Sequence, residues 1–449
     1  MHPNLSFEQA PPISVPYRFF LTAPCFGVAA GLLLAWLGPG ALESRWSPGA
    51  LAMSHLLTVG FMLQVMCGAL LQFIPVATGG NVWRPRWVAT LVHPLIAIAA
   101  LSLVSGFALS QPLLFQIAAP LFVVGLGGFI AVVMFSLLRT PAHGMTIQLL
   151  RLAVFGLTAT LILGVSLASA LGWQSDSQAG WPLVMISNVH AAWGLGAWAL
   201  MLVIGVSYLV VPMFQLTPTY PVWLTRLVPF GILIAIGFWS LQLVVDSQAA
   251  QPWLPAIALA GMLLAALYAG STLNLQARRR RRLTDVTLVY WRGSMLALLA
   301  FVASWIAMEL FPELGEHPRA PVWLGVLALP GVFVSVISGM LYKIMPFLNW
   351  LHLQRLGGLK ILPPNIKQML PEKKMRRQLT LHFTSIVLLL AAVLWPPLAT
   401  LAGLVFAASC IWLEWNLVGA VKVYIDFKRR ALLDQATSQI HAVAACREL

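Results

Sequence analysis

Two histidines, His55 and His190, are the residues whose type and position point most directly to chemistry. Each lies in a long apolar stretch, where an ionisable side chain is costly and indicates function by default. Neutral imidazole is an axial ligand of haem iron and also binds copper or zinc. The alternative is a structural histidine that is hydrogen-bonded to a neighbouring helix. Because the two occur at similar depth, we interpret the pair as haem or metal ligands.

Three further histidines are weaker candidates. His93 and His382 lie near the inner ends of their apolar stretches and could form a second haem site, although histidine is common at membrane interfaces. His317 lies in the loop before the tenth stretch and could fold back as a third metal ligand beside His55 and His190.

Glu414 is the one carboxylate that the sequence places at mid-membrane depth. It could relay protons, or it could be a structural partner of Lys343 or Tyr342. The sequence identifies no catalytic residue.

The composition defines the elements that must position these side chains. Of the 449 residues, 60% are hydrophobic and 9% are charged, which excludes an ordinary soluble domain. Backbone in lipid must satisfy its own hydrogen bonds, so apolar stretches of about 20 residues are predicted to be membrane-spanning helices. We predict twelve spans: 18–37, 50–75, 87–109, 113–138, 149–172, 181–213, 222–245, 252–275, 286–311, 321–348, 379–395 and 398–424.

The basic residues predict the orientation. Of 27 Lys and Arg, only Arg45 and Arg319 fall in loops on the side away from the N-terminus. By the positive-inside rule, both termini are predicted to be cytoplasmic. The net charge of +14 therefore reflects topology and the attraction of anionic lipid headgroups, and we expect no nucleic-acid partner.

One motif divides the chain into three units. A glycine precedes a proline by seven residues in the second, sixth and tenth spans, at Gly68–Pro75, Gly205–Pro212 and Gly339–Pro346. We therefore predict one transmembrane domain over residues 1–449, built from three pseudo-repeats of four helices over about 18–138, 149–275 and 286–424. A cytoplasmic linker (349–378) and a cytoplasmic tail (425–449) complete the chain. Glycine allows close helix approach, and the proline ends or kinks the helix.

The first two units carry a histidine, but at different offsets. His55 precedes its glycine by 13 residues and His190 by 15. This difference is roughly half a helical turn, so the two rings need not face the same point. The third unit has no histidine in this part of its second helix.

This pattern resembles subunit I of the haem-copper oxidase superfamily, including its nitric oxide reductase branch and the NnrS-type membrane proteins. The similarity lies in the three sets of four helices, the cytoplasmic termini, and the segment Ser54-His-Leu-Leu-Thr-Val-Gly-Phe61 followed by Gly68 to Pro75. The resemblance implies haem b, with copper as a further candidate, a cytochrome or quinol as redox partner, and a location in the bacterial inner membrane.

The chain departs from that family at the metal centre. Family members bind haem and metal through histidines on helices 2, 6, 7 and 10, whereas here helices 7 and 10 have none. Gly194 stands four residues after His190, where aerobic oxidases often have a tyrosine. A standard binuclear centre is therefore not expected.

Three functional hypotheses follow. The first is a haem-binding protein of respiratory or nitric-oxide-related redox chemistry; if it is an enzyme, it is a haem-copper type of oxidoreductase. The second is a twelve-helix transporter of a metal or small solute. The third is a cofactor-free partner subunit. The sequence leaves the oligomeric state open.

Overall fold

The chain folds into a bundle of helices that cross a membrane. The computed structural model describes residues 7–140, 144–173, 181–244, 253–280, 283–354 and 363–447, with the side chains of the last helix described as far as Leu433. Every regular element within these ranges is helical. Twelve spans are long and apolar enough to cross a bilayer. The predicted fold class, an all-α integral membrane protein, and the predicted number of spans are thus confirmed.

Nine of the spans contain a single long helix. They are α1 (Ser14–Leu37), α4 (Pro85–Leu109), α5 (Pro112–Arg139), α6 (Met145–Trp173), α9 (Val222–Ser240), α11 (Leu254–Ala277), α12 (Val286–Leu310), α17 (Glu372–Leu394) and α18 (Ala399–Arg447). The ends of the bundle carry short pieces, namely η1 (Phe7–Gln9), η2 (Gly38–Leu42), η6 (Leu241–Leu243), α13 (Pro312–Gly315), α16 (Ile366–Met369) and η8 (Pro396–Leu398).

The other three spans change helix type along their length. Each contains a π-helical segment of eight residues between two α-helical parts, in the order α2 (Pro48–His55), η3 (Leu56–Leu63) and α3 (Gln64–Thr78); α7 (Leu183–Ala192), η5 (Trp193–Leu200) and α8 (Met201–Gln215); and α14 (Ala320–Val326), η7 (Leu327–Val334) and α15 (Ser335–Gln354). π-Helical turns are rare and often mark functional sites.

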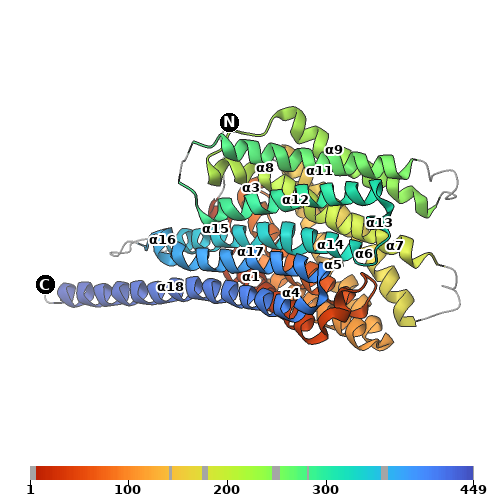
Figure 1. Cartoon of the computed structure of the whole chain (residues 1–449). Coiled ribbons are helices and arrows are strands. Elements are labelled where there is room, and N and C mark those ends of the chain that lie inside the picture. The colour runs from red at the N-terminus through yellow and green to blue at the C-terminus, as the bar shows by residue number, and fades with distance from the viewer. Residues whose placement is uncertain are drawn as a thin grey trace.

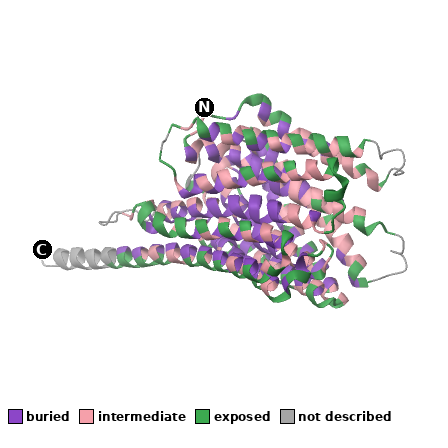
Figure 2. Ribbon diagram, in the orientation of Figure 1, coloured by how far each residue is buried: buried purple, intermediate pink, exposed green. Residues whose placement is uncertain are grey.

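These three composite spans form the centre of the bundle. Their apolar windows are 78%, 67% and 83% buried, whereas no other span exceeds 44%. Buried residues accordingly gather inside the bundle in Figure 2, and exposed residues cover its outer helices and ends. We call the end where α1 begins the inner end, on the left of Figure 1, and the end near α13 the outer end. The Gly-x6-Pro spans are therefore the core helices.

The three π segments lie at the same distance in sequence from their motif glycines. Each ends five residues before its glycine, at Leu63, Leu200 and Val334. The helices continue beyond the three prolines to Thr78, Gln215 and Gln354. Of the two predicted effects of the prolines, ending or kinking the helix, the structure therefore excludes the first.

The motif glycines also make equivalent close contacts. A Cβ placed on Gly68 would lie 2.8 Å from Cβ of Phe19 on α1, and one on Gly205 would lie 2.8 Å from Cβ of Leu149 on α6. A Cβ on Gly339 would lie 2.6 Å from Cβ of Tyr290 on α12. Each glycine thus packs against the first helix of its own predicted unit, as expected for close helix approach.

A second contact, eight residues earlier on each central span, has the same arrangement. Its pairs are Gly60 with Phe26, Ala197 with Gly156, and Gly331 with Ala297. On the first helix of each unit, the residue in this second contact lies seven positions after the residue that contacts the motif glycine. These paired contacts support the predicted three-unit organisation, which stays a prediction.

The last two spans differ from their predicted bounds. The turn at Trp395-Pro396-Pro397 is present, because α17 ends at Leu394 and α18 begins at Ala399. However, α17 already begins at Glu372, and α18 continues for 49 residues to Arg447. The predicted linker is therefore shorter, with residues 355–362 outside the described ranges, and the predicted tail continues the last helix. Hydropathy detects the apolar part of a helix and misses its charged extension.

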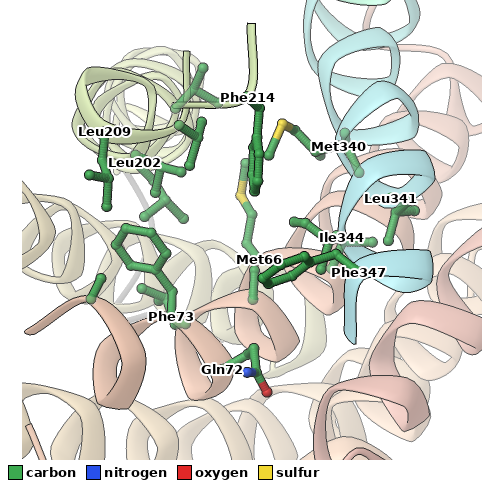
Figure 3. Close-up of a pocket in the computed structure, with 18 of the residues that line it drawn as sticks. Met66, Gln72, Phe73, Leu202, Leu209, Phe214, Met340, Leu341, Ile344 and Phe347 are labelled. Carbon is green, nitrogen blue, oxygen red and sulfur yellow. The ribbon is translucent and has the colours of Figure 1, made fainter. Parts of the chain in front are cut away.

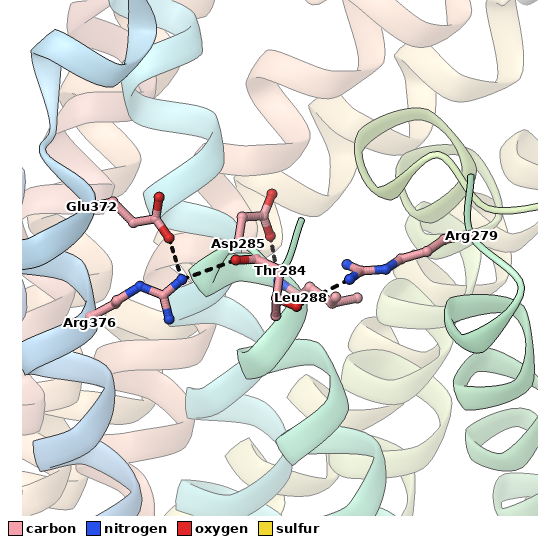
Figure 4. Close-up of polar contacts among 6 residues, drawn as sticks. All are labelled: Arg279, Thr284, Asp285, Leu288, Glu372 and Arg376. Carbon is pink, nitrogen blue, oxygen red and sulfur yellow. Dashed lines mark hydrogen bonds and ion pairs between the residues drawn. The ribbon is translucent and has the colours of Figure 1, made fainter. Parts of the chain in front are cut away.

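Polar contacts fasten the inner ends of α12 and α17 (Figure 4). The Asp285 carboxylate caps α12 by accepting from the Leu288 N–H at 2.9 Å. Arg376 of α17 pairs with Glu372 at 2.5 Å and donates to the Thr284 carbonyl oxygen at 3.1 Å. Arg279 donates to the Thr284 hydroxyl at 3.2 Å. The inner-end loop before α12 is thereby tied to α17, and the contact between Arg279 and Thr284 lies within the loop.

Candidate functional site

His55 and His190 line one cavity at the outer end of the bundle, with a volume of about 710 Å³. We call it the histidine cavity. All three central spans contribute to its wall, together with residues of α4, α5 and α6. Although their registers differ by half a turn, the structure brings both rings to the same space.

A backbone carbonyl orients each ring. Nδ1 of His55 lies 2.8 Å from the Leu51 carbonyl oxygen, and Nδ1 of His190 lies 3.1 Å from the Thr160 carbonyl oxygen of α6. A carbonyl can only accept, so each Nδ1 carries the proton and Nε2 keeps its lone pair. Neither Nε2 has a hydrogen-bond partner among the described residues.

The surrounding side chains fix the rings further. The Phe107 ring stacks on His55, with centroids 5.1 Å apart and an interplanar angle of 26°. Gly164 of α6 makes room for His190, because a Cβ there would lie 2.9 Å from Cε1 of the imidazole. Most of the wall is aliphatic or aromatic. Such a wall is typical of sites that bind a largely apolar cofactor.

The third central span faces the cavity with apolar residues. Counted from the motif glycine, Val326 corresponds to His55 and Leu324 corresponds to His190, and both side chains line the cavity. The position that lacks a histidine in the sequence is thus filled by aliphatic side chains.

Arg45 brings a positive charge to the same cavity. It lies in the loop between η2 and α2, lines the cavity wall, and donates to the Asn188 amide oxygen of α7 at 2.6 Å. Its guanidinium carbon lies 4.2 Å from the centroid of the Trp46 ring, a cation–π contact. Burial lowers the pKa of Arg45 from its ordinary value, because removal from water disfavours the charged form.

His93 and His382 have separate neighbours outside this cavity. Nε2 of His93 is 2.8 Å from the Thr22 hydroxyl, and the ring meets Phe19 edge-on. Nε2 of His382 is 2.8 Å from the Ser335 hydroxyl. The structure does not join the two rings, and each has its Nε2 occupied. Their role as a second haem site stays a prediction.

His317 lies at the exposed outer end. Its Nδ1 accepts the Arg319 backbone N–H at 3.1 Å, and the residue is not part of the cavity wall. In the described ranges, no group of three or more His, Cys, Asp or Glu side chains forms a metal site. The third-ligand role of His317 also stays a prediction.

Glu414 lies on α18, which packs against α1 and α17. Asn416, two residues on, donates to the Tyr342 hydroxyl at 2.8 Å and to the Lys374 carbonyl oxygen at 3.4 Å, in the first turn of α17. The two expected partners are engaged elsewhere, since Lys343 pairs with Asp285 and Tyr342 donates to Gln378. Oε2 of Glu414 is buried without a hydrogen-bond partner. The proton-relay role stays a prediction.

A second cavity, of about 170 Å³, lies between the inner halves of the three central spans. Figure 3 shows side chains from α3, α8 and α15 around it, including Phe73, Phe214 and Phe347. Gln72 supplies the amide of an otherwise apolar or aromatic wall. We call this space the inner cavity.

Sequence reasoning missed three contributors to the histidine cavity. Arg45 was detectable, because it is one of two basic residues on the outer side. Gly164 and the Thr160 carbonyl oxygen carried no sequence signal, since their role depends on how α6 packs against α7.

The chain was compared with known proteins. No family model matches it, and no curated protein matches it. The assignment of function therefore rests on the geometry of the histidine cavity.

Proposed function

We propose that the chain is a haem-binding membrane protein that holds a b-type haem in the histidine cavity and acts in respiratory or nitric-oxide-related redox chemistry. One observation carries the proposal: two imidazoles line one cavity, each with Nδ1 bound to a carbonyl oxygen and with Nε2 free of a hydrogen-bond partner among the described residues. Metal-binding histidines almost always donate the other ring N–H in this way. The cavity volume of about 710 Å³ is in the range of cofactor sites.

The roles of the residues follow from the contacts. His55 and His190 supply the ligating nitrogens, while the Leu51 and Thr160 carbonyl oxygens hold the rings in one tautomer. The apolar wall excludes water from the site. A bound haem supplies one-electron chemistry and, where an axial position is open, binding of diatomic gases. Copper is the further candidate for the same nitrogens.

The apolar third face argues against a standard binuclear centre. Val326 and Leu324 stand where further imidazoles would be needed, and aliphatic side chains do not bind metals. The proposal is therefore electron transfer or gas binding at a haem, with a cytochrome or quinol as donor.

The proposal includes an organisation and a location. Three units of four helices share one plan, as the π segments and the paired glycine contacts support. The inner end, with its concentration of Lys and Arg, faces the cytoplasm of a bacterial cell. Both termini lie on that side.

A visible spectrum of the detergent-purified protein tests the function. We expect a Soret band and a reduced α-band of the b type after expression with ample haem. His55→Ala and His190→Ala should each lower the haem content or change the spin state, because each removes a nitrogen from the cavity. His93→Ala provides the comparison, since this histidine also lies within a span but outside the cavity. An unchanged spectrum is expected if haem binds only in the histidine cavity, and a loss of haem would indicate the predicted second site.

The spectrum also separates the two proposed haem roles, which are electron transfer and gas binding. Two histidines on one iron give a low-spin spectrum, whereas one histidine gives a high-spin spectrum that changes on addition of nitric oxide. Exogenous imidazole should restore the spectrum of a correctly folded His→Ala variant. Haem that persists unchanged in the His55→Ala, His190→Ala double variant would contradict the site.

A transporter is the second candidate, favoured by the inner cavity. The same three spans line the histidine cavity and the inner cavity at successive depths, as a route through the bundle requires. The nearly apolar inner wall disfavours a hydrated ion. Haem-free protein that takes up a metal or solute in proteoliposomes, with Gln72→Leu slowing uptake, would favour this candidate. Haem-free protein without uptake would favour a cofactor-free partner subunit.

A further inference from the structure

Arg45 is a half-buried cation without a counter-ion in the described structure. The ion pairs among the described residues are Lys343 with Asp285 and Arg376 with Glu372. Arg45 instead has a neutral amide, Asn188, and the face of Trp46 as partners. An unpaired charge at the edge of an apolar cavity is costly. An anionic group brought in by a ligand would remove that cost.

The position of the guanidinium defines where this anionic group lies. Asn188 precedes His190 by two residues on α7, about 3 Å along the helix axis. The guanidinium that reaches Asn188 is therefore within one helical turn of the His190 level. A ligand bound by the imidazoles would present its outer edge to Arg45.

We infer that Arg45 binds a carboxylate of the cavity ligand and thereby orients a haem with its acidic edge toward the outer end. This inference rests on the proposed function. Haem has an apolar ring with two carboxylates on one edge, which matches an apolar cavity that has one cation at its outer side. Arg45 binds one carboxylate oxygen through the guanidinium N–H groups that Asn188 does not use. Arg45 is a positioning residue, and the histidines are the ligands.

A lipid phosphate is the other anion that could reach an outer-loop arginine. A lipid phosphate would neutralise Arg45 but would give the cavity no preference for haem with free carboxylates over haem with esterified carboxylates. A comparison of haem with its dimethyl ester separates the two sources, because the ester keeps the ring and the iron and lacks the negative charges.

The experiment measures the affinity of haem-depleted, detergent-purified full-length protein for haem and for haem dimethyl ester, from the Soret change on titration. We expect wild type to bind haem about tenfold or more tightly than the ester, as for a charge-assisted hydrogen bond. Arg45→Gln should bind both with equal affinity, and Arg45→Lys should keep part of the preference. Arg319→Gln, the other outer-side arginine, is the matched control and should behave as wild type.

The outcomes are distinct. Equal affinity of wild type for haem and ester, or an unchanged preference in Arg45→Gln, overturns the role of Arg45 while haem binding stands. A wild type that binds neither compound overturns the proposed function and this inference with it. A fall in the haem affinity of Arg45→Gln to that of the ester, with ester binding retained at the wild-type level, supports the inference and shows that the variant is folded.

Discussion

His55 and His190 show how single residues become candidate ligands inside a membrane. Each imidazole lines the histidine cavity, with one nitrogen bound by a carbonyl oxygen and the other without a hydrogen-bond partner among the described residues. His382 differs, because the Ser335 hydroxyl occupies its Nε2 at 2.8 Å. His382 is also fully buried, whereas His55 and His190 are partly exposed and line the cavity. The partner of the second nitrogen and the access to the cavity therefore separate a candidate ligand from a structural histidine.

The structural role of His382 is testable with two serines on one helix. Ser335→Ala should lower the free energy of unfolding by about 1–3 kcal/mol, because it leaves a buried imidazole nitrogen without a partner. Ser338→Ala is the matched control, since Ser338 is equally buried and its hydroxyl has no hydrogen-bond partner in the described part of the chain. It should be neutral or stabilising. Unfolding in mixed micelles measures both, and equal losses would contradict a structural bond between Ser335 and His382.

At the scale of the helices, the three central spans share two features that position their neighbours. Each has a π segment that ends five residues before the motif glycine, and each glycine lies against the first helix of its unit. The sequence predicted the glycine contacts from the motif alone. It could not predict the π segments, because a π turn depends on packing by the neighbouring helices and has no residue signature in these spans.

Substitution of the motif glycines tests their equivalence. Gly68→Ala, Gly205→Ala and Gly339→Ala should each destabilise the protein by about 1–3 kcal/mol, because a Cβ would lie 2.6 to 2.8 Å from another Cβ and the helices would have to move apart. Gly325→Ala, on the third central span with nothing within 4 Å of the added Cβ, should be neutral or slightly stabilising. Thermal unfolding in detergent measures all four. A loss at only one of the three motif glycines would argue against equivalent units.

At the scale of the whole molecule, the histidine cavity belongs to no single unit. Its candidate ligands come from the first and second predicted units, and the third predicted unit supplies an apolar face. Hydropathy predicted all twelve spans, and the positions of His55 and His190 predicted their depth. Their shared cavity was beyond the sequence, since a half-turn difference in register is resolved only by the three-dimensional packing.

The orientation of the whole bundle is also testable. Fluorescent protein fused to the C-terminus should fluoresce, and alkaline phosphatase fused there should be inactive, since both results indicate a cytoplasmic end. In intact cells with the outer membrane permeabilised, Glu313→Cys at the outer end should react with an impermeant maleimide, and Glu372→Cys at the inner end should not. Labelling of the unmodified protein is the background. The reverse pattern would invert the predicted topology.

The length of α18 has a practical consequence for structure determination. Its 49 residues extend about 74 Å at 1.5 Å per residue, although about 30 Å suffices to cross the hydrocarbon. A large part of the helix therefore stands clear of the detergent or lipid as one continuous rod. A small helical protein joined in register to this rod would keep a fixed angle to the bundle and serve as an alignment marker in electron cryo-microscopy. A 48.9 kDa protein that lies mostly within the micelle otherwise offers few features for particle alignment.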